Sequence, residues 1–237
     1  MSGAAAWRWS LAAGVVMLLG GAAFARIPGL VACGDDGGHG AIIALELART
    51  PADVAALFGT EPCRSAAIAA QRTALWIDAL LFIPAYTAVL SLAAWAANRR
   101  VAPPIVAALV IAGLADEIEG VLLGQVLAEP PGTQPLLDAL FWMVRLKFLL
   151  LALATAMIGA LLVVRLRWLP VGFGIVVAVA GVQALLGWWA LPRPGMMSGF
   201  TIGWLVLFVT AALASVWPSA FAPARAHRPR SPAPRSA

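Results

Sequence analysis

Long apolar runs constrain this chain more than any other feature. Runs of 18 or more apolar residues recur along the sequence, and each is long enough to cross a hydrocarbon core of about 30 Å as a helix. Charged residues make up only 11% of the chain and the mean hydropathy is +0.91, whereas a soluble domain of this size needs a charged exterior. The runs are continuous rather than alternating, which argues against a transmembrane β-barrel. We therefore predict an all-α, polytopic membrane helix bundle.

The apolar runs predict about six membrane-spanning helices within a single bundle over residues 1–217. The expected spans are 10–32, 73–97, 103–128, 137–164, 169–190 and 197–217. Arginines precede the first span and follow the second, fourth and sixth, so the positive-inside rule places both termini in the cytoplasm. These arginines are Arg8; Arg99 and Arg100; Arg165 and Arg167; and Arg225, Arg228, Arg230 and Arg235. An outer loop then covers 33–72, and a basic, disordered cytoplasmic tail covers 218–237.

The N-terminus has a second interpretation, which the sequence leaves open. Arg8, the apolar run 11–21 and the small residues "AFA" at 23–25 resemble a secretory signal with its cleavage site. The apolar character resumes through "IPGLVA", which suits a complete span. We therefore favour a retained first helix.

The outer loop carries the only two cysteines, Cys33 and Cys63. Two cysteines in one loop on the oxidising side of a membrane predict a disulfide. Thr50 can cap a short helix that begins at Pro51, and Gly59 can end it. The segment "CGDDGGHG" holds two aspartates and a histidine that could bind a metal. Its glycine content favours a turn, so we predict no metal site.

The stretch "AGLADEIEGVLLG" (112–124) puts three carboxylates into the third span. At 100° per residue, Asp116 and Glu119 share one helix face, and Glu117 lies at the edge of the same arc. An unpaired charge at the membrane centre costs about 2.5–3.5 kcal/mol, so these acids should face the bundle interior. Gly120 and Gly124 lie beside them, at a spacing that favours close approach of another helix, and Gly195, Gly199 and Gly203 repeat that spacing in the sixth span.

Basic partners for these acids can come from the fourth span. Arg145 and Lys147 lie at a suitable depth, but they point about 200° apart and cannot both face the third span. Asp138 is a candidate local partner for Arg145. Asp78 in the second span should approach the same group of charges, and Arg26 near the end of the first span is a further candidate cation. Acids remain in excess, so one carboxyl is expected to be protonated at neutral pH.

Three segments resemble a family of uncharacterised bacterial multi-pass membrane proteins. They read "FGTEP…WIDALLFIPAYTAVL", "AGLADEIEGVLL" and "RLKFLLLAL" and cover about residues 40–155. The family pattern has an Asp and a Tyr on one helix, D-x-x-E-N on the next and a Lys on the following one. The resemblance implies a site formed by Asp78, Tyr86, Asp116, Glu119 and Lys147, with Gly120 standing where the family has Asn. It also implies a bacterial inner-membrane location and makes Lys147 the preferred partner of the acids.

We weigh three functions for this chain. The first is binding or translocation of a cation, a proton or an amphiphilic small molecule at the acidic group, because ionisable residues inside a membrane are functional candidates. The second is a structural or assembly protein whose ion network fixes helix register. The third is a membrane-embedded acid–base enzyme acting on a lipid or isoprenoid, although the expected spans contain no His, no Cys and no G-x-S-x-G motif.

The expected partners follow from the same features. We expect membrane lipids, a small-molecule or ion ligand and no cofactor, and a homo-oligomer stays open. Because the arginines lie at helix ends and in the tail, as topology requires, we expect no nucleic acid.

Overall fold

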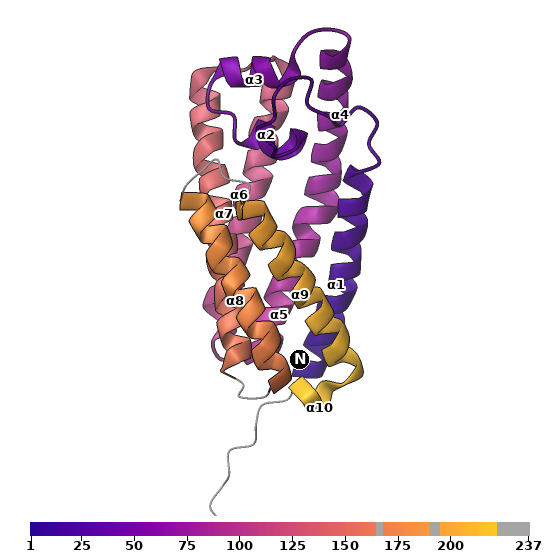
Figure 1. Ribbon diagram of the computed structural model, residues 1–237, viewed down its shortest axis with the longest axis vertical. Coiled ribbons are helices and arrows are strands. Elements are labelled where there is room, and N and C mark those ends of the chain that lie inside the picture. Colours follow the sequence, from indigo (N-terminus) through magenta and orange to yellow (C-terminus); the bar gives the residue numbers. More distant parts are fainter. Residues whose placement is uncertain (165–167, 190–194, 222–237) are drawn as a thin grey trace, which may run out of the picture.

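The computed structural model describes residues 1–164, 168–189 and 195–221, and the regular structure within these ranges is helical (Figure 1). Long helical segments form the bundle: α1 (Gly3–Phe24), α4 (Cys63–Ile77) continuing through the π-helical turn η1 (Asp78–Phe82) into α5 (Ile83–Asn98), α6 (Ala102–Ala128), α7 (Gln134–Val163), α8 (Trp168–Trp189) and α9 (Gly195–Val216). Short helices are α2 (Ala41–Glu46), α3 (Pro51–Phe58) and α10 (Pro218–Phe221). The protein is thus an all-α polytopic bundle.

Five of these segments are long and apolar enough to cross a membrane: α1, α4 to α5, α7, α8 and α9. The expected third span, 103–128, corresponds to α6, which has 27 residues and packs against α5 and α7 but is more polar than the other five because it carries three carboxylates. Trp7 of α1 makes an edge contact with Phe221 of α10 at a centroid distance of 6.4 Å, so the beginning of α1 and the short helix α10 lie at the same end of the bundle (Figure 1). That arrangement requires an even number of crossings, and α6 supplies the sixth.

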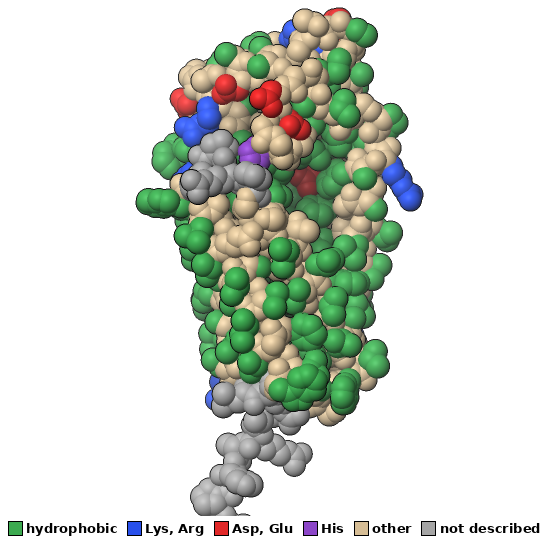
Figure 2. Space-filling model, in the orientation of Figure 1, with side chains coloured by type: hydrophobic (Ala, Val, Ile, Leu, Met, Phe, Trp, Pro, Cys, Tyr) green, Lys and Arg blue, Asp and Glu red, His purple; other side chains and the backbone are tan. Residues whose placement is uncertain are grey.

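The outer surface of the bundle fits a membrane environment. Hydrophobic side chains cover the middle of the face in Figure 2, and charged side chains gather at the end that carries α2 and α3. Large apolar side chains such as Leu80, Val121 and Val179 are 72%, 64% and 60% exposed. A soluble surface would not leave so many of them in water.

The helix ends differ from the expected spans at two places. The first helix begins at Gly3, where Ser2 accepts a capping bond from the Ala5 N–H, and it ends at Phe24 rather than 32. Pro28, which lacks an N–H, and Gly29, with φ of 78°, prevent its continuation. The second segment begins ten residues earlier than expected, at Cys63, because its polar first turns lie outside the apolar run that defined the span.

Glycines allow close packing of α7, α8 and α9. A Cβ on Gly159 of α7 would meet the backbone of Ala178 of α8, and one on Gly199 of α9 would lie 2.6 Å from the Ala180 carbonyl oxygen. The packing role expected for Gly199 is therefore confirmed. The same expectation is wrong for Gly120 and Gly124, because no atom of the described residues lies within 4 Å of a Cβ built on either glycine. Their face of α6 borders an open groove instead of another helix.

The outer loop is fixed to the end of the bundle. The expected disulfide joins Cys33 to Cys63 and so ties the chain after α1 to the first residue of α4. The Arg49 guanidinium stacks 3.3 Å above the Phe141 ring of α7, and Gln134 Nε2 donates to the Arg49 carbonyl at 2.9 Å. These contacts hold the segment that carries α2 and α3 over the helices.

The short helix expected from Thr50 is confirmed as α3. Thr50 and Asp53 form a reciprocal capping box, and Pro51 is the first helical residue. The helix ends at Phe58 and is followed by Gly59, the expected stop, whose φ is 56°. The Arg49 backbone N–H donates to Asp53, and this bond lowers the pKa of the Asp53 carboxyl.

The segment "CGDDGGHG" forms a turn. Asp35 and Asp36 each accept a bond at 2.9 Å from the backbone N–H of the residue two positions later, Gly37 and Gly38. Both carboxylates thus serve the local backbone.

Part of the expected tail is helical. Pro218–Phe221 form α10, and Phe221 is buried against Trp7. The rest of the tail (222–237), with its four arginines, lies outside the described residues, as do Arg165, Arg167 and residues 190–194.

Candidate ion-binding site

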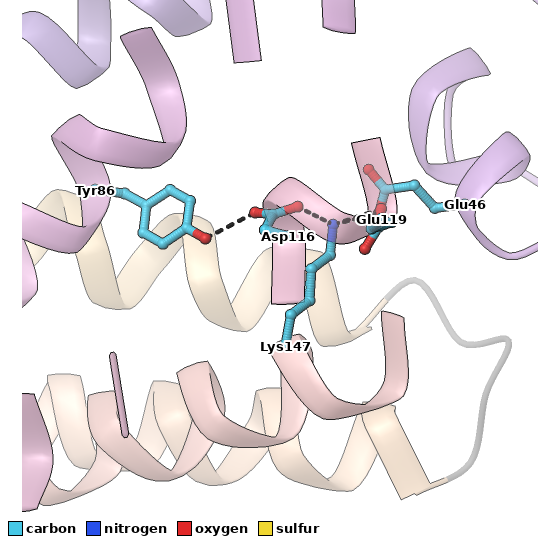
Figure 3. A network of polar contacts seen from close by, with 5 residues as sticks. All are labelled: Glu46, Tyr86, Asp116, Glu119 and Lys147. Carbon is cyan, nitrogen blue, oxygen red and sulfur yellow. Dashed lines mark hydrogen bonds and ion pairs between the residues drawn. The ribbon is translucent and has the colours of Figure 1, made fainter. Parts of the chain in front are cut away.

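A lysine surrounded by three carboxylates lies inside the bundle (Figure 3). Lys147 Nζ is 2.8 Å from Asp116 Oδ1, 2.8 Å from Glu119 Oε1 and 3.0 Å from Glu46 Oε2. The contact with Glu46 lacks hydrogen-bond geometry and is an ion pair only. All four residues are at most 6% exposed. We call these four residues the Lys147 cluster.

Helix periodicity explains how α6 and α7 contribute to the cluster. Asp116 and Glu119 are three positions apart on α6, so both point to the same side, where α7 packs. The expectation that a basic side chain of the fourth span lies within ion-pair reach of both acids is confirmed by Lys147. Tyr86 of α5 donates from its hydroxyl to Asp116 Oδ2 at 2.7 Å and stacks on Trp204 of α9 at 5.3 Å. Asp116 is therefore held from two sides.

Glu46 is the member of the cluster that the sequence analysis missed. It is the last residue of α2, within the segment read as outer loop. Buried Ala41 and Leu45 anchor α2, and Gln71 of α4 donates to the Ala41 carbonyl at 2.8 Å, which sets the depth of the helix. The signal in the sequence was the apolar stretch "AIIALEL", in which one acid stands among apolar residues. Burial raises the pKa of the Glu46 carboxyl above its usual range.

The Lys147 cluster has an excess of acid. Three carboxylates face one ammonium group, so full ionisation would leave two negative charges buried. Uncompensated buried charge costs several kcal/mol, and such a group takes up a proton or a cation instead. Glu119 Oε2 is buried and has no hydrogen-bond partner among the described residues. This oxygen is the natural acceptor for an added positive charge.

A small cavity is lined in part by Glu119. Its volume is about 10 Å³, close to the minimum that holds one water molecule. Glu119, Glu46, Asp116 and Asp78 line it together with Gln71. Acidic side-chain atoms are visible at the bottom of a hollow between α2 and α4 in Figure 2. The cavity gives a small ion or a water-bound proton a place among four carboxyls.

Asp78 reaches this cavity from the distorted turn η1. Pro84 has no N–H to offer the carbonyl four residues before it, and the Ile83 N–H bonds to the Asp78 carbonyl five residues before it. The helix widens here, which accounts for η1. The Asp78 side chain makes no hydrogen bond or ion pair with any described residue, although it lines the same cavity as Asp116 and Glu119, as expected.

The other candidate cations lie elsewhere. Arg145 donates to the Trp188 carbonyl at 3.2 Å, and its guanidinium lies 4.2 Å from the Trp188 ring, so it belongs to the contact between α7 and α8. It does not pair with Asp138, which accepts a bond from Gln134 instead. Arg26 is exposed beyond the end of α1. Two neighbouring charges on α7 thus serve different helices, because they project from opposite sides of it.

The fold and this site define a multi-pass α-helical membrane protein with a buried, acid-rich cluster. Comparison of the chain with models of known protein families, with curated proteins and with solved structures gave no match. The function therefore has to be argued from the site itself.

Proposed function

We propose that the protein binds, or carries across the membrane, a proton or a small monovalent cation at the Lys147 cluster. The observation that carries this proposal is Glu119 Oε2, a buried carboxylate oxygen without a hydrogen-bond partner among the described residues, on a side chain that lines a cavity together with three other carboxyls. The surplus of negative charge favours a positive ligand. Because the Lys147 ammonium offsets one of the three carboxylates, the surplus of negative charge stays small. A positive ligand can therefore be bound and also be released.

The test is binding of ²²Na⁺ and uptake of protons by the purified full chain. We expect saturable Na⁺ binding that protons compete with, and we expect Glu119→Gln to abolish it. Arg145→Met is the control, because it removes a charge from the same helix outside the cluster. A wild-type protein that bound no Na⁺ and took up the same number of protons as Glu119→Gln would refute the proposal.

A structural role is the second candidate, and one observation favours it. The Lys147 ammonium connects α2, α6 and α7, Tyr86 joins α5 to them through Asp116, and buried ion networks can fix helix register. If this role were the only one, Glu119→Gln would change stability and leave cation binding and proton uptake at the wild-type level.

We also propose that the end carrying α2 and α3 lies outside and that the N-terminal end faces the cytoplasm of a bacterial cell. Arg99 and Arg100 lie beside Met1 at the N-terminal end, in accordance with the positive-inside rule. Ser65→Cys should then react with an impermeant thiol reagent in intact cells, and Asn98→Cys should not. The reverse pattern would contradict this orientation.

A further inference from the structure

A groove opens on the side of the bundle between α4 and α6. Its volume is about 340 Å³, within the range of about 300–1,000 Å³ that is typical of small-molecule sites. Leu75, Trp76, Ala79, Ile83 and Val121 supply its apolar wall, and Gly120 and Gly124 form its floor. Because no atom from the described part of the chain lies within 4 Å of a Cβ built on either glycine, their missing side chains create the space. Trp76 and Val121 are 69% and 64% exposed, so the groove opens on the apolar side of the bundle.

The groove adjoins the cavity of the Lys147 cluster. Leu75, Asp78 and Gly120 line both spaces. Asp78, which has no hydrogen bond or ion pair with any described residue, therefore stands at the boundary between the groove and the other three carboxyls of the cavity. Behind it, buried Glu119 has its unpartnered oxygen. A group that entered along the groove would meet Asp78 first and Glu119 next.

The charged side chains that line the groove favour a positively charged occupant. Asp78 and Glu117 are acidic, and Arg72 is the only basic side chain among the described residues that line the groove. Arg72 Nη2 donates to the Leu127 carbonyl at 2.6 Å, so that cation is already engaged with the backbone of α6. An apolar groove that leads to acidic side chains fits a hydrocarbon chain that ends in a positively charged group.

We propose that this groove binds a single-chain cationic amphiphile, with its amine at Asp78 beside Gly120 and its hydrocarbon chain along Trp76 and Val121. The inference rests on the proposed function, because it identifies the amine as a cation that the acid-rich site accepts from the lipid side. The hydrocarbon chain adds apolar contact that a bare ion lacks. Asp78 supplies the charge-assisted hydrogen bond that orients the headgroup.

The experiment uses dodecylamine as the probe and dodecanoate as its anionic counterpart. Binding is measured by equilibrium dialysis with the full chain in phosphatidylcholine nanodiscs, and uptake by protein-free discs is subtracted. Gly120→Leu fills the groove, and Asp78→Asn removes its inner charge with little change of shape. Gly172→Leu on α8 is the matched control, because a Cβ there also meets no atom of the described ranges within 4 Å and the residue does not line the groove.

We expect saturable binding of dodecylamine to the wild type and to Gly172→Leu, with affinity reduced about tenfold or more in Gly120→Leu and Asp78→Asn. Dodecanoate should not compete. Equal binding to the wild type and both groove variants, or absence of saturable binding, would overturn the inference. Displacement by dodecanoate would also overturn it, because it would make Arg72 the headgroup partner.

The two proposals fail in different ways. If the wild type takes up Na⁺ or protons through Glu119 but dodecylamine does not bind at the groove, only the amphiphile is wrong. If dodecylamine binding is unchanged in Glu119→Gln and the wild type takes up neither Na⁺ nor protons through Glu119, the proposed function fails and the groove is a separate site.

Discussion

Removal of the Lys147 ammonium tests whether the cluster is held by charge. In Lys147→Met, three buried carboxylates lose a cation that lies 2.8–3.0 Å away. At an effective dielectric constant of 20, one such pair at 2.8 Å is worth about 6 kcal/mol of gross attraction. The acids have a less costly alternative, which is to bind a proton. Neutralising a glutamate at pH 7 costs about 3.7 kcal/mol, from a reference pKa of about 4.3 and 1.36 kcal/mol per unit.

The variant should therefore lose about 4 kcal/mol of unfolding free energy at pH 7, in line with about 3–5 kcal/mol for removing one partner of a buried pair. Apart from the proton that Lys147 itself carries in both states of the wild type, the folded variant binds one more proton than the folded wild type, while the unfolded states bind the same number. The loss should then shrink by about 1.4 kcal/mol for each unit that the pH falls and approach zero near pH 4.3.

The assay is reversible unfolding by SDS in mixed micelles, followed by tryptophan fluorescence at several pH values. Lys147→Met/Glu119→Gln should be more stable than Lys147→Met, because one fewer acid is stranded. Arg145→Met is the control: it should lose its contact with Trp188 and keep the pH dependence of the wild type. A Lys147→Met protein as stable as the wild type, or a loss independent of pH, would refute the reasoning.

Three further expectations concern other parts of the molecule. Serines at Cys33 and Cys63 should cost about 3–4 kcal/mol by the chain-entropy model for a separation of 30 residues, which unfolding of the oxidised and double-variant proteins can compare. Gly159→Leu should separate α7 from α8, since its side chain would meet the Ala178 backbone, and thermal denaturation should show a clearly lower midpoint than for Gly172→Leu. Burial raises the pKa of Glu46, so this carboxyl holds a proton in the folded protein in the pH range just above the ordinary pKa of about 4.3. The stability that this bound proton contributes is lost as the pH rises through the raised pKa. Glu46→Gln should therefore weaken the dependence of stability on pH, measured by the same SDS titration.

Much of the fold and part of the site could be predicted from the sequence. The length of the apolar runs predicts the helix bundle, and the placement of the arginines predicts its orientation. The cost of an unpaired charge inside the membrane predicts that Asp116 and Glu119 face the bundle interior. Depth alone did not separate Lys147 from Arg145, because both lie on α7 within one turn of each other. The choice depends on which face of α7 meets α6.

Other features were beyond sequence reasoning because they depend on tertiary packing. Glu46 lies on a helix of six residues that has no periodicity of its own to reveal its buried side. The Gly120–Gly124 pair has the same spacing as Gly199–Gly203, yet only the second pair meets neighbouring atoms. The spacing of the glycines identifies a helix face made of small residues, but it does not show whether another helix packs against that face.

The central claim is that the Lys147 cluster holds an exchangeable positive charge besides that of Lys147. Infrared difference spectroscopy of the purified protein measures it directly, because a protonated carboxyl has a C=O stretching band that a carboxylate lacks. We expect the wild type at neutral pH to show this band, the band to weaken when Na⁺ is added, and Glu119→Gln to abolish that response. Absence of a protonated carboxyl band, together with absence of any Na⁺-dependent change in the carboxylate bands, would contradict the claim.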